Sequence, residues 1–93
     1  MERKQLQATI YGRVQGVSFR YYTQREASKI GVVGWVANQW DGTVRTVAEG
    51  EESQLQQFLQ YLHKGSPHAH VTQVDTIWTN ASGEFDHFEI RTL

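Results

Sequence analysis

The apolar residues of this chain fall in short runs whose spacing changes from one run to the next. Residues 6–11, Leu-Gln-Ala-Thr-Ile-Tyr, alternate apolar and polar side chains, which is the period of a half-buried strand. Residues 21–30 contain no turn residue and place Thr23, Ala27 and Ile30 at helical spacing, and Gly31 is a typical helix stop. The chain is therefore predicted to begin with a strand followed by a helix.

A hairpin and a second helix are predicted next. β-Forming residues fill segments 32–38 and 43–48, and the Asp41-Gly42 pair between them is a strong hairpin signal. The segment that begins at residue 51 opens with two glutamates, which suit the positive end of a helix. Its apolar residues recur at i, i+3, i+4 and i+7, and they are Leu55, Phe58, Leu59 and Leu62. The Gly-Ser-Pro sequence at 65–67 ends this helix.

Two further strands are predicted at residues 71–78 and 85–91, with a turn at 80–83. The order is β-α-β-β-α-β with a short extra C-terminal strand, which is the ferredoxin-like arrangement. We therefore expect an α+β fold in which one antiparallel-rich sheet carries two helices on one face. The chain has 93 residues and contains no repeat, low-complexity tract or linker, so residues 1–93 are expected to form a single domain.

Composition narrows the classes of function. The formal net charge is −1, whereas proteins that coat nucleic acid usually carry a basic excess, so no nucleic-acid partner is expected. The absence of cysteine excludes disulfides, thiolate zinc sites and a cysteine nucleophile, and is compatible with a reducing cytoplasm. No apolar run resembles a signal peptide or reaches membrane-spanning length. We therefore expect a cytoplasmic protein with no membrane partner.

The stretch YGRVQGVSFRYY, residues 11–22, joins the first predicted strand to the first predicted helix. A loop that runs into a helix N-terminus presents backbone N–H groups without intrahelical partners, and the helix dipole adds positive potential. Gly12 and Gly16 allow the backbone to approach an anion closely. Arg20 lies at the predicted start of the helix, where its guanidinium can contact the same anion. A phosphate site is one interpretation of this loop.

Two alternatives to the phosphate site have to be weighed. The loop can be a plain strand-to-helix turn with Arg13 and Arg20 in solvent, and the residues alone leave this alternative open. An RNA-binding role is less favoured, because the similar aromatic motif of RNA-recognition domains lies in a strand after the first helix, not before it. Two known phosphate-loop patterns are absent, since no Gly-Lys-Ser/Thr follows Gly16 and no Gly-x-Gly-x-x-Gly occurs.

Residues 12–20, Gly-Arg-Val-Gln-Gly-Val-Ser-Phe-Arg, resemble the signature of the acylphosphatase family. Residues 31–38 and 41–44 resemble its second conserved block, and the likeness extends through 65–67 to 88–90, so it covers essentially the whole chain. The resemblance implies a monomeric, metal-independent enzyme without a cofactor that hydrolyses the carboxyl–phosphate bond of small acyl phosphates. The alternative in the same family is a non-catalytic module that binds phosphate or carbamoyl phosphate.

The resemblance also implies which residues form the site. The catalytic residues are expected to be Arg20, which binds the phosphate, and Asn38, which positions the attacking water. Residue type alone would instead favour a role for Asn38 in the turn before Asp41. Ser18 occupies a position that varies in the family, so no catalytic hydroxyl is assigned. The residues expected to bind the phosphate of the substrate, mainly through backbone amides, are Gln15, Gly16, Val17, Ser18, Phe19 and Arg20.

The histidines offer a metal site as a further candidate. His68 and His70 lie close together in the loop predicted after the second helix. Exposed histidines without a ligand are the more common outcome for such a pair, so no metal is expected.

Overall fold

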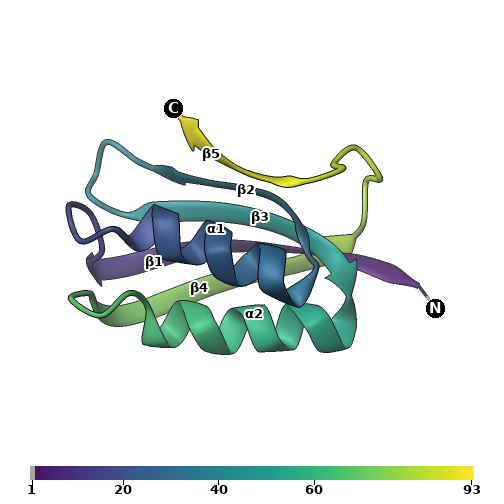
Figure 1. Cartoon of the computed structure of the whole chain (residues 1–93), viewed down its shortest axis with the longest axis horizontal. Coiled ribbons are helices and arrows are strands. Elements are labelled where there is room, and N and C mark those ends of the chain that lie inside the picture. Colours follow the sequence, from purple (N-terminus) through teal and green to yellow (C-terminus); the bar gives the residue numbers. More distant parts are fainter. Residues whose placement is uncertain (1) are drawn as a thin grey trace.

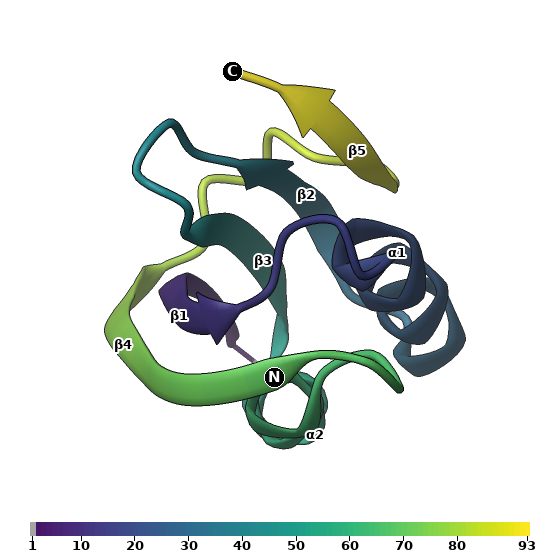
Figure 2. The same ribbon diagram turned by 90° about the vertical axis from the view of Figure 1, so that its left-hand side faces the viewer.

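The computed structural model describes residues 2–93, in which five strands form one sheet and two helices cover one of its faces (Figures 1 and 2). The predicted α+β, ferredoxin-like element order is confirmed. The elements, in chain order, are β1 (Arg3–Arg13), α1 (Phe19–Ile30), β2 (Val33–Asn38), β3 (Val44–Glu51), α2 (Glu52–Lys64), β4 (His70–Asn80) and β5 (Phe88–Thr92). The strands β1 and β4 are longer than predicted, because they pair with each other along nearly their whole length.

The sheet has the strand order β4-β1-β3-β2-β5. All neighbouring pairs are antiparallel except β2 and β5, which are parallel. Strands β1, β2 and β5 therefore run in the same direction, and their C-terminal ends lie at the same end of the sheet. Three parts of the chain meet at this end of the sheet, where α1 also begins (Figure 1). They are the loop after β1, the last residue of β2 and the last residues of β5.

The core lies between the sheet and the two helices. Strand β1 contributes Leu6, Ala8 and Ile10, which are at most 1% exposed. Burial of one such large apolar side chain stabilises the fold by about 1.5–3 kcal/mol. The helix faces agree with the predicted spacing, with Ile30 and Leu59 only partly buried. The buried residues that the helices contribute are Phe19, Thr23 and Ala27 from α1 and Leu55, Phe58 and Leu62 from α2.

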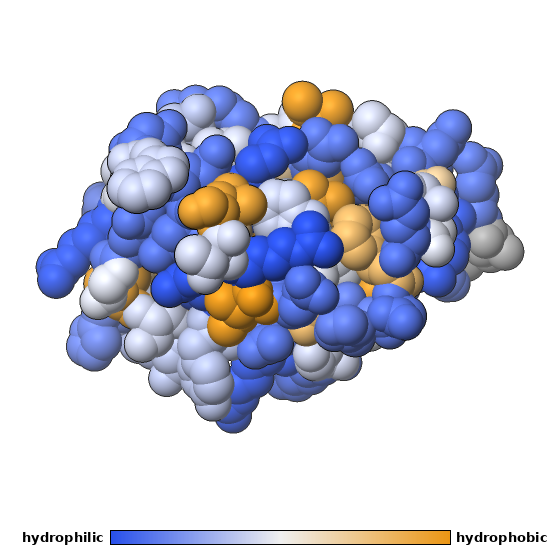
Figure 3. All heavy atoms as spheres, turned by 90° about the horizontal axis from the view of Figure 1, so that it is seen from above, coloured by the Kyte–Doolittle hydropathy of each residue, from blue (hydrophilic) through white to orange (hydrophobic). Residues whose placement is uncertain are grey.

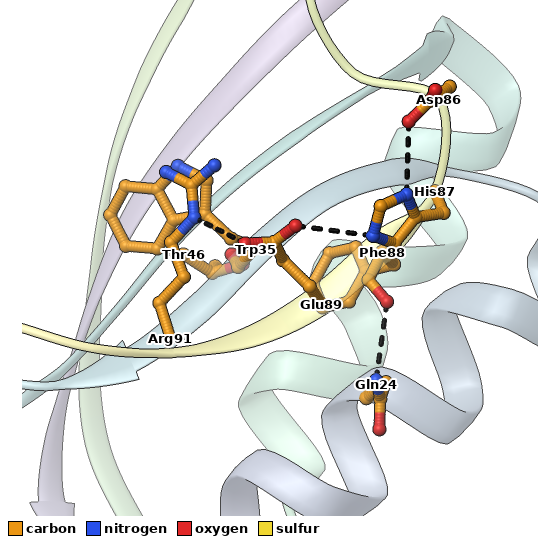
Figure 4. Close-up of polar contacts among 8 residues, drawn as sticks. All are labelled: Gln24, Trp35, Thr46, Asp86, His87, Phe88, Glu89 and Arg91. Atoms are coloured by element: carbon orange, nitrogen blue, oxygen red, sulfur yellow. Dashed lines mark hydrogen bonds and ion pairs between the residues drawn. The ribbon is translucent and has the colours of Figure 1, made fainter.

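Strand β5 is held at the edge of the sheet by contacts from α1 and β2 (Figure 4). The Gln24 side chain donates a hydrogen bond to the Phe88 carbonyl at 3.2 Å. The Arg91 guanidinium lies 5.3 Å from the centre of the Trp35 ring and donates to Glu89 at 2.8 Å. These contacts fix the end of β5 beside the end of β2, where Thr92 is paired with Asn38.

The surface on the β5 side is mostly hydrophilic and carries several separate apolar patches (Figure 3). Ile90 and Leu93 are exposed apolar residues in this part of the chain. No helix within residues 2–93 is both long enough and apolar enough to span a membrane.

Candidate active site

The loop between β1 and α1 is anchored by apolar side chains. Val14, Val17 and Phe19 are 1%, 8% and 2% exposed and belong to the core. Because their side chains point into the protein, Val17 and Phe19 can contact a ligand through their backbone only. This agrees with the expectation that the loop binds through main-chain amides.

The backbone of the loop alternates in handedness. Gly16 and Ser18 have positive φ angles of 73° and 60°, whereas Val17 between them does not. Such alternation points successive N–H groups to one side and forms an anion-binding concavity. A Cβ at residue 16 would meet no atom within 4 Å, so the backbone angle, not the space, favours glycine there.

The N–H groups of this loop have no protein partner. Within the described chain, none of the backbone N–H groups of residues 16–19 donates a hydrogen bond. Ser18 is the N-cap residue of α1, but its side chain makes no capping bond, and the first turn of α1 contains no acidic residue. The positive end of the helix is therefore open to an external anion.

Arg20 is the second residue of α1 and is partly buried. The four ion pairs found among residues 2–93 all lie elsewhere, so no carboxylate there neutralises its guanidinium. A free guanidinium beside free backbone N–H groups can bind a phosphate with bidentate geometry. The predicted proximity of Arg20 to the loop is thus present in the structure.

Asn38 is the last residue of β2 and is paired with Val44, whose side chain belongs to the core between the sheet and the helices. Cross-strand partners lie on the same face of a sheet, so the Asn38 side chain is on the face that carries α1. Its Oδ1 atom is buried and accepts no hydrogen bond from residues 2–93. A buried acceptor without a partner is uncommon and calls for an explanation.

Arg20 and Asn38 both line two of the cavities that adjoin the loop. The smaller cavity, of about 210 Å³, is also lined by loop residues Val14, Gly16, Ser18 and Phe19, and by Tyr21 and Ile90. The larger cavity, of about 360 Å³, is also lined by Gln15, Gln39, Trp40, Thr92 and Leu93. The structure therefore brings together the two residues that the sequence singled out, one from a helix start and one from a strand end.

Gln15 uses its side chain to tie the loop to the β2–β3 turn. Its Nε2 group donates to the Gln39 carbonyl at 2.8 Å and to the Thr43 carbonyl at 2.9 Å. The turn is itself closed by Asp41, whose carboxylate accepts from the N–H and the hydroxyl of Thr43. The Thr43 hydroxyl bond lowers the pKa of Asp41. Only the backbone of Gln15 is then free for the predicted contact with phosphate.

Sequence reasoning left several cavity residues without a role. Trp40 is 97% exposed at the rim of the larger cavity. Tyr21 is 54% exposed and lines the smaller cavity. The only signal for Tyr21 was its place beside the predicted phosphate loop, and Trp40, in the predicted hairpin turn, had no such signal. No group of three or more potential metal-ligating side chains occurs among residues 2–93.

Comparison with known proteins identifies related chains. The acylphosphatase family model matches residues 6–90. The acylphosphatase of Salinibacter ruber is 43% identical over 88 residues, which cover 95% of this chain and 93% of the relative. That of Bacillus licheniformis is 48% identical over 86 residues, covering 92% of this chain and 96% of the relative. The crystal structure of acylphosphatase from Bacillus subtilis superposes with a TM-score of 0.92 at 40% identity, covering 95% of this chain and 98% of that chain.

Proposed function

Because the chain belongs to the acylphosphatase family, we propose that residues 15–20 hold the phosphate of an acyl phosphate while Asn38 positions the attacking water. The protein is a hydrolase that converts an acyl phosphate and water into a carboxylate and inorganic phosphate. One observation carries the assignment of residues. Arg20 and Asn38 line the same two cavities, beside backbone N–H groups that have no partner within the described chain.

The loop and Arg20 supply positive potential where the transition state carries negative charge. In phosphoryl transfer the charge is spread over three equatorial oxygens, and catalysis depends mainly on positioning and electrostatic stabilisation. The N–H groups of residues 16–19 and the Arg20 guanidinium are donors of the kind that this charge needs. They can fill the role that Mg²⁺ has in other phosphoryl-transfer enzymes, so no metal ion is included in the proposal.

Asn38 has both a donor and an acceptor in its side-chain amide. Rotation about its terminal torsion, which has a broad energy minimum, turns the unpartnered Oδ1 toward a water in the cavity. The water oxygen then bonds to phosphorus while the bond from phosphorus to the carboxylate oxygen breaks. The carboxylate is a stable leaving group that needs no proton, and we assign the proton of the water to a phosphate oxygen.

The remaining features of the proposal concern the whole chain. A single domain spanning residues 1–93 is supported by one continuous sheet, one core and a family match that covers residues 6–90. Monomeric action is part of the proposal because the family resemblance implies it. A net charge of −1 favours action without nucleic acid, and the lack of cysteine suits the cytoplasm.

The direct test is the rate of benzoyl phosphate hydrolysis in excess EDTA. The wild type is expected to hydrolyse it rapidly, and Asn38→Ala is expected to lower kcat by about 10²–10³-fold, as loss of one positioning group does in other enzymes. Asn80→Ala is the matched control, because Asn80 also ends a strand but lies at the end of the sheet opposite Asn38. A wild type that binds phosphate but is no faster than buffer would support the non-catalytic alternative.

A further inference from the structure

Ser66 makes a buried contact with the phosphate loop from a distant part of the chain. Its hydroxyl donates a hydrogen bond to the Val17 carbonyl at 2.7 Å, across 49 residues of sequence. The residue is 2% exposed. The segment 65–67 is the predicted helix stop and part of the stretch that resembles the acylphosphatase family, but the residues assigned to the phosphate do not include Ser66.

The turn that carries Ser66 is closed by backbone hydrogen bonds. The Gly65 N–H donates to the Tyr61 carbonyl at 2.7 Å and closes the last turn of α2, while the Ala69 N–H donates to the Ser66 carbonyl at 3.0 Å. A Cβ at residue 65 would lie 2.9 Å from Cε2 of Phe19, so glycine is needed for this close approach. The hydroxyl therefore reaches the loop from a turn whose own backbone hydrogen bonds do not involve the loop.

The contact determines which way one peptide group faces. A peptide bond is planar and trans, so the Val17 carbonyl and the Ser18 N–H point in opposite directions. The linings of the two hollows on either side of the loop agree with this. Val17 lines the hollow that also contains Pro67 and His68, whereas Ser18 also lines the cavity with Arg20 and Asn38.

We propose that Ser66 is a positioning residue, whose hydroxyl holds the Val17–Ser18 peptide so that the Ser18 N–H faces the phosphate. The proposal rests on the proposed binding of phosphate by residues 15–20. Without the hydroxyl, the Val17 carbonyl loses its partner, and a flip of the peptide would turn this oxygen toward the phosphate. A donor that stabilises the anion would then be replaced by an acceptor that repels it.

Inorganic phosphate is a suitable probe because it reports on the loop without catalysis. In a titration of ¹⁵N-labelled wild type, the Ser18 amide proton is expected to shift strongly downfield as phosphate binds. In Ser66→Ala the dissociation constant for phosphate is expected to rise about tenfold, as for loss of one hydrogen bond to a charged group. The shift of the Ser18 amide should also shrink more than the shifts of Gly16 and Phe19. A loss of stability alone would not single out one amide.

The chain offers a matched control for deletion of a buried hydroxyl. Thr23 is 0% exposed, and its hydroxyl has no partner within the described chain. Thr23→Val should therefore keep the phosphate affinity of the wild type to within about twofold, since no hydrogen bond is removed. Ser66→Cys retains a weak donor of similar shape and should give an intermediate affinity. It also provides the test if Ser66→Ala does not fold.

The outcomes separate this inference from the proposed function. If phosphate shifts no amide among residues 16–19 of the wild type, the phosphate site itself is wrong, and the role of Ser66 falls with it. If the wild type responds and Ser66→Ala or Ser66→Cys binds phosphate equally well with the same Ser18 shift, only the inference about Ser66 is overturned. A wild type that binds phosphate without a shift at Ser18 overturns it as well.

Discussion

The helices α1 and α2 differ in how the N–H groups of their first turns are satisfied. At α2, Glu51 and Gln54 form a capping box, in which the Gln54 side chain accepts from the N–H of Glu51 at 3.0 Å. At α1, Ser18 has a left-handed conformation and makes no capping bond, and no acidic residue lies in the first turn. One helix start is closed by its own side chains, and the other is left open.

A third group of N–H donors, at the opposite end of the sheet from the candidate active site, extends this comparison. The N–H groups of Ser82 and Gly83 donate to the carboxylate of Glu49 at 2.7 and 3.0 Å, and the Gln5 side chain donates to it at 2.6 Å. Here the chain supplies both the donors and the anion. Backbone donors are thus satisfied internally where they stabilise the fold, and are left free where we propose that the substrate anion binds.

Removal of Arg20 should have the largest effect on the open site. Arg20→Ala is expected to lower kcat/KM for benzoyl phosphate by about 10³-fold or more, in the range found when a charge-stabilising arginine is lost from a phosphoryl-transfer site. Because Arg20 has no ion-pair partner among residues 2–93, the free energy of unfolding should change little. Steady-state kinetics and urea denaturation measure the two effects.

Arg13 is the matched control for this prediction. It is the last residue of β1, at the start of the same loop, and is exposed. It lines the hollow on the Pro67 side of the loop and not the two cavities that Arg20 shares with Asn38. An equal loss of activity in Arg13→Ala and Arg20→Ala would mean that general positive charge, not the geometry at the start of α1, binds the substrate.

Loss of the carboxylate at Glu49 should show the reverse pattern. Glu49 is 1% exposed, and an amide at this position would face N–H donors that it can no longer fully satisfy. Glu49→Gln is expected to lower the free energy of unfolding by roughly 2–4 kcal/mol, as for other disrupted buried charges. The kcat of the folded fraction should remain that of the wild type. A variant that keeps its stability but loses activity would refute the structural role of this carboxylate.

The same carboxylate predicts a pH dependence of stability. Burial raises the pKa of Glu49, but the bonds from Ser82, Gln5 and Gly83 outweigh burial and lower the pKa below its ordinary value of 4.5. A carboxyl group whose pKa is lower in the folded state stabilises the fold fully above the unfolded value, and this contribution is lost as the pH falls through the folded value. The difference in stability between wild type and Glu49→Gln should therefore be constant above about pH 5 and shrink below pH 4.5. Urea denaturation at several pH values measures it.

An internal anion placed at α1 should make its start resemble that of α2. Ser18→Asp is expected to raise the inhibition constant of inorganic phosphate about tenfold or more, because the new carboxylate repels the ligand and competes for the same N–H groups. The same change should stabilise the fold by about 0.5 kcal/mol through the helix dipole. Ser18→Asn introduces a neutral side chain of the same shape as aspartate. It should therefore show neither the charge repulsion of phosphate nor the stabilisation through the helix dipole. Tighter phosphate binding in Ser18→Asp would contradict an open anion site at this position.

Features encoded by neighbouring residues could be predicted from the sequence. The Asp41-Gly42 hairpin and the apolar face of α2 follow from local turn preference and helical spacing, and both are present. The position of Arg20 at the start of α1 also follows, since the glycine-containing loop must end where the helix begins. The structure places it one residue after the helix start.

Contacts between distant residues could not be predicted in the same way. The predicted third strand stopped at residue 48, because Glu49 does not resemble a buried strand residue. Its partners lie 33 to 44 residues away, and Ser66 lies 49 residues from Val17. Nothing in the local pattern near Glu49 or Ser66 indicates that a distant polar group satisfies it. These interactions exist only once the sheet has brought the segments together.

A small effect, confined to stability, is expected at the closed start of α2. Glu51→Ala removes the carboxylate of this capping box and is expected to lower the free energy of unfolding by about 1 kcal/mol, the usual value for a lost N-cap. Glu51→Gln retains a side-chain oxygen and should recover much of this loss. Because α2 begins at the end of the sheet opposite the two cavities, kcat/KM of both variants should equal that of the wild type. Thermal or urea denaturation alongside benzoyl phosphate kinetics tests this, and a loss of activity in Glu51→Ala without a loss of stability would mean that the two helix starts do not have separate roles.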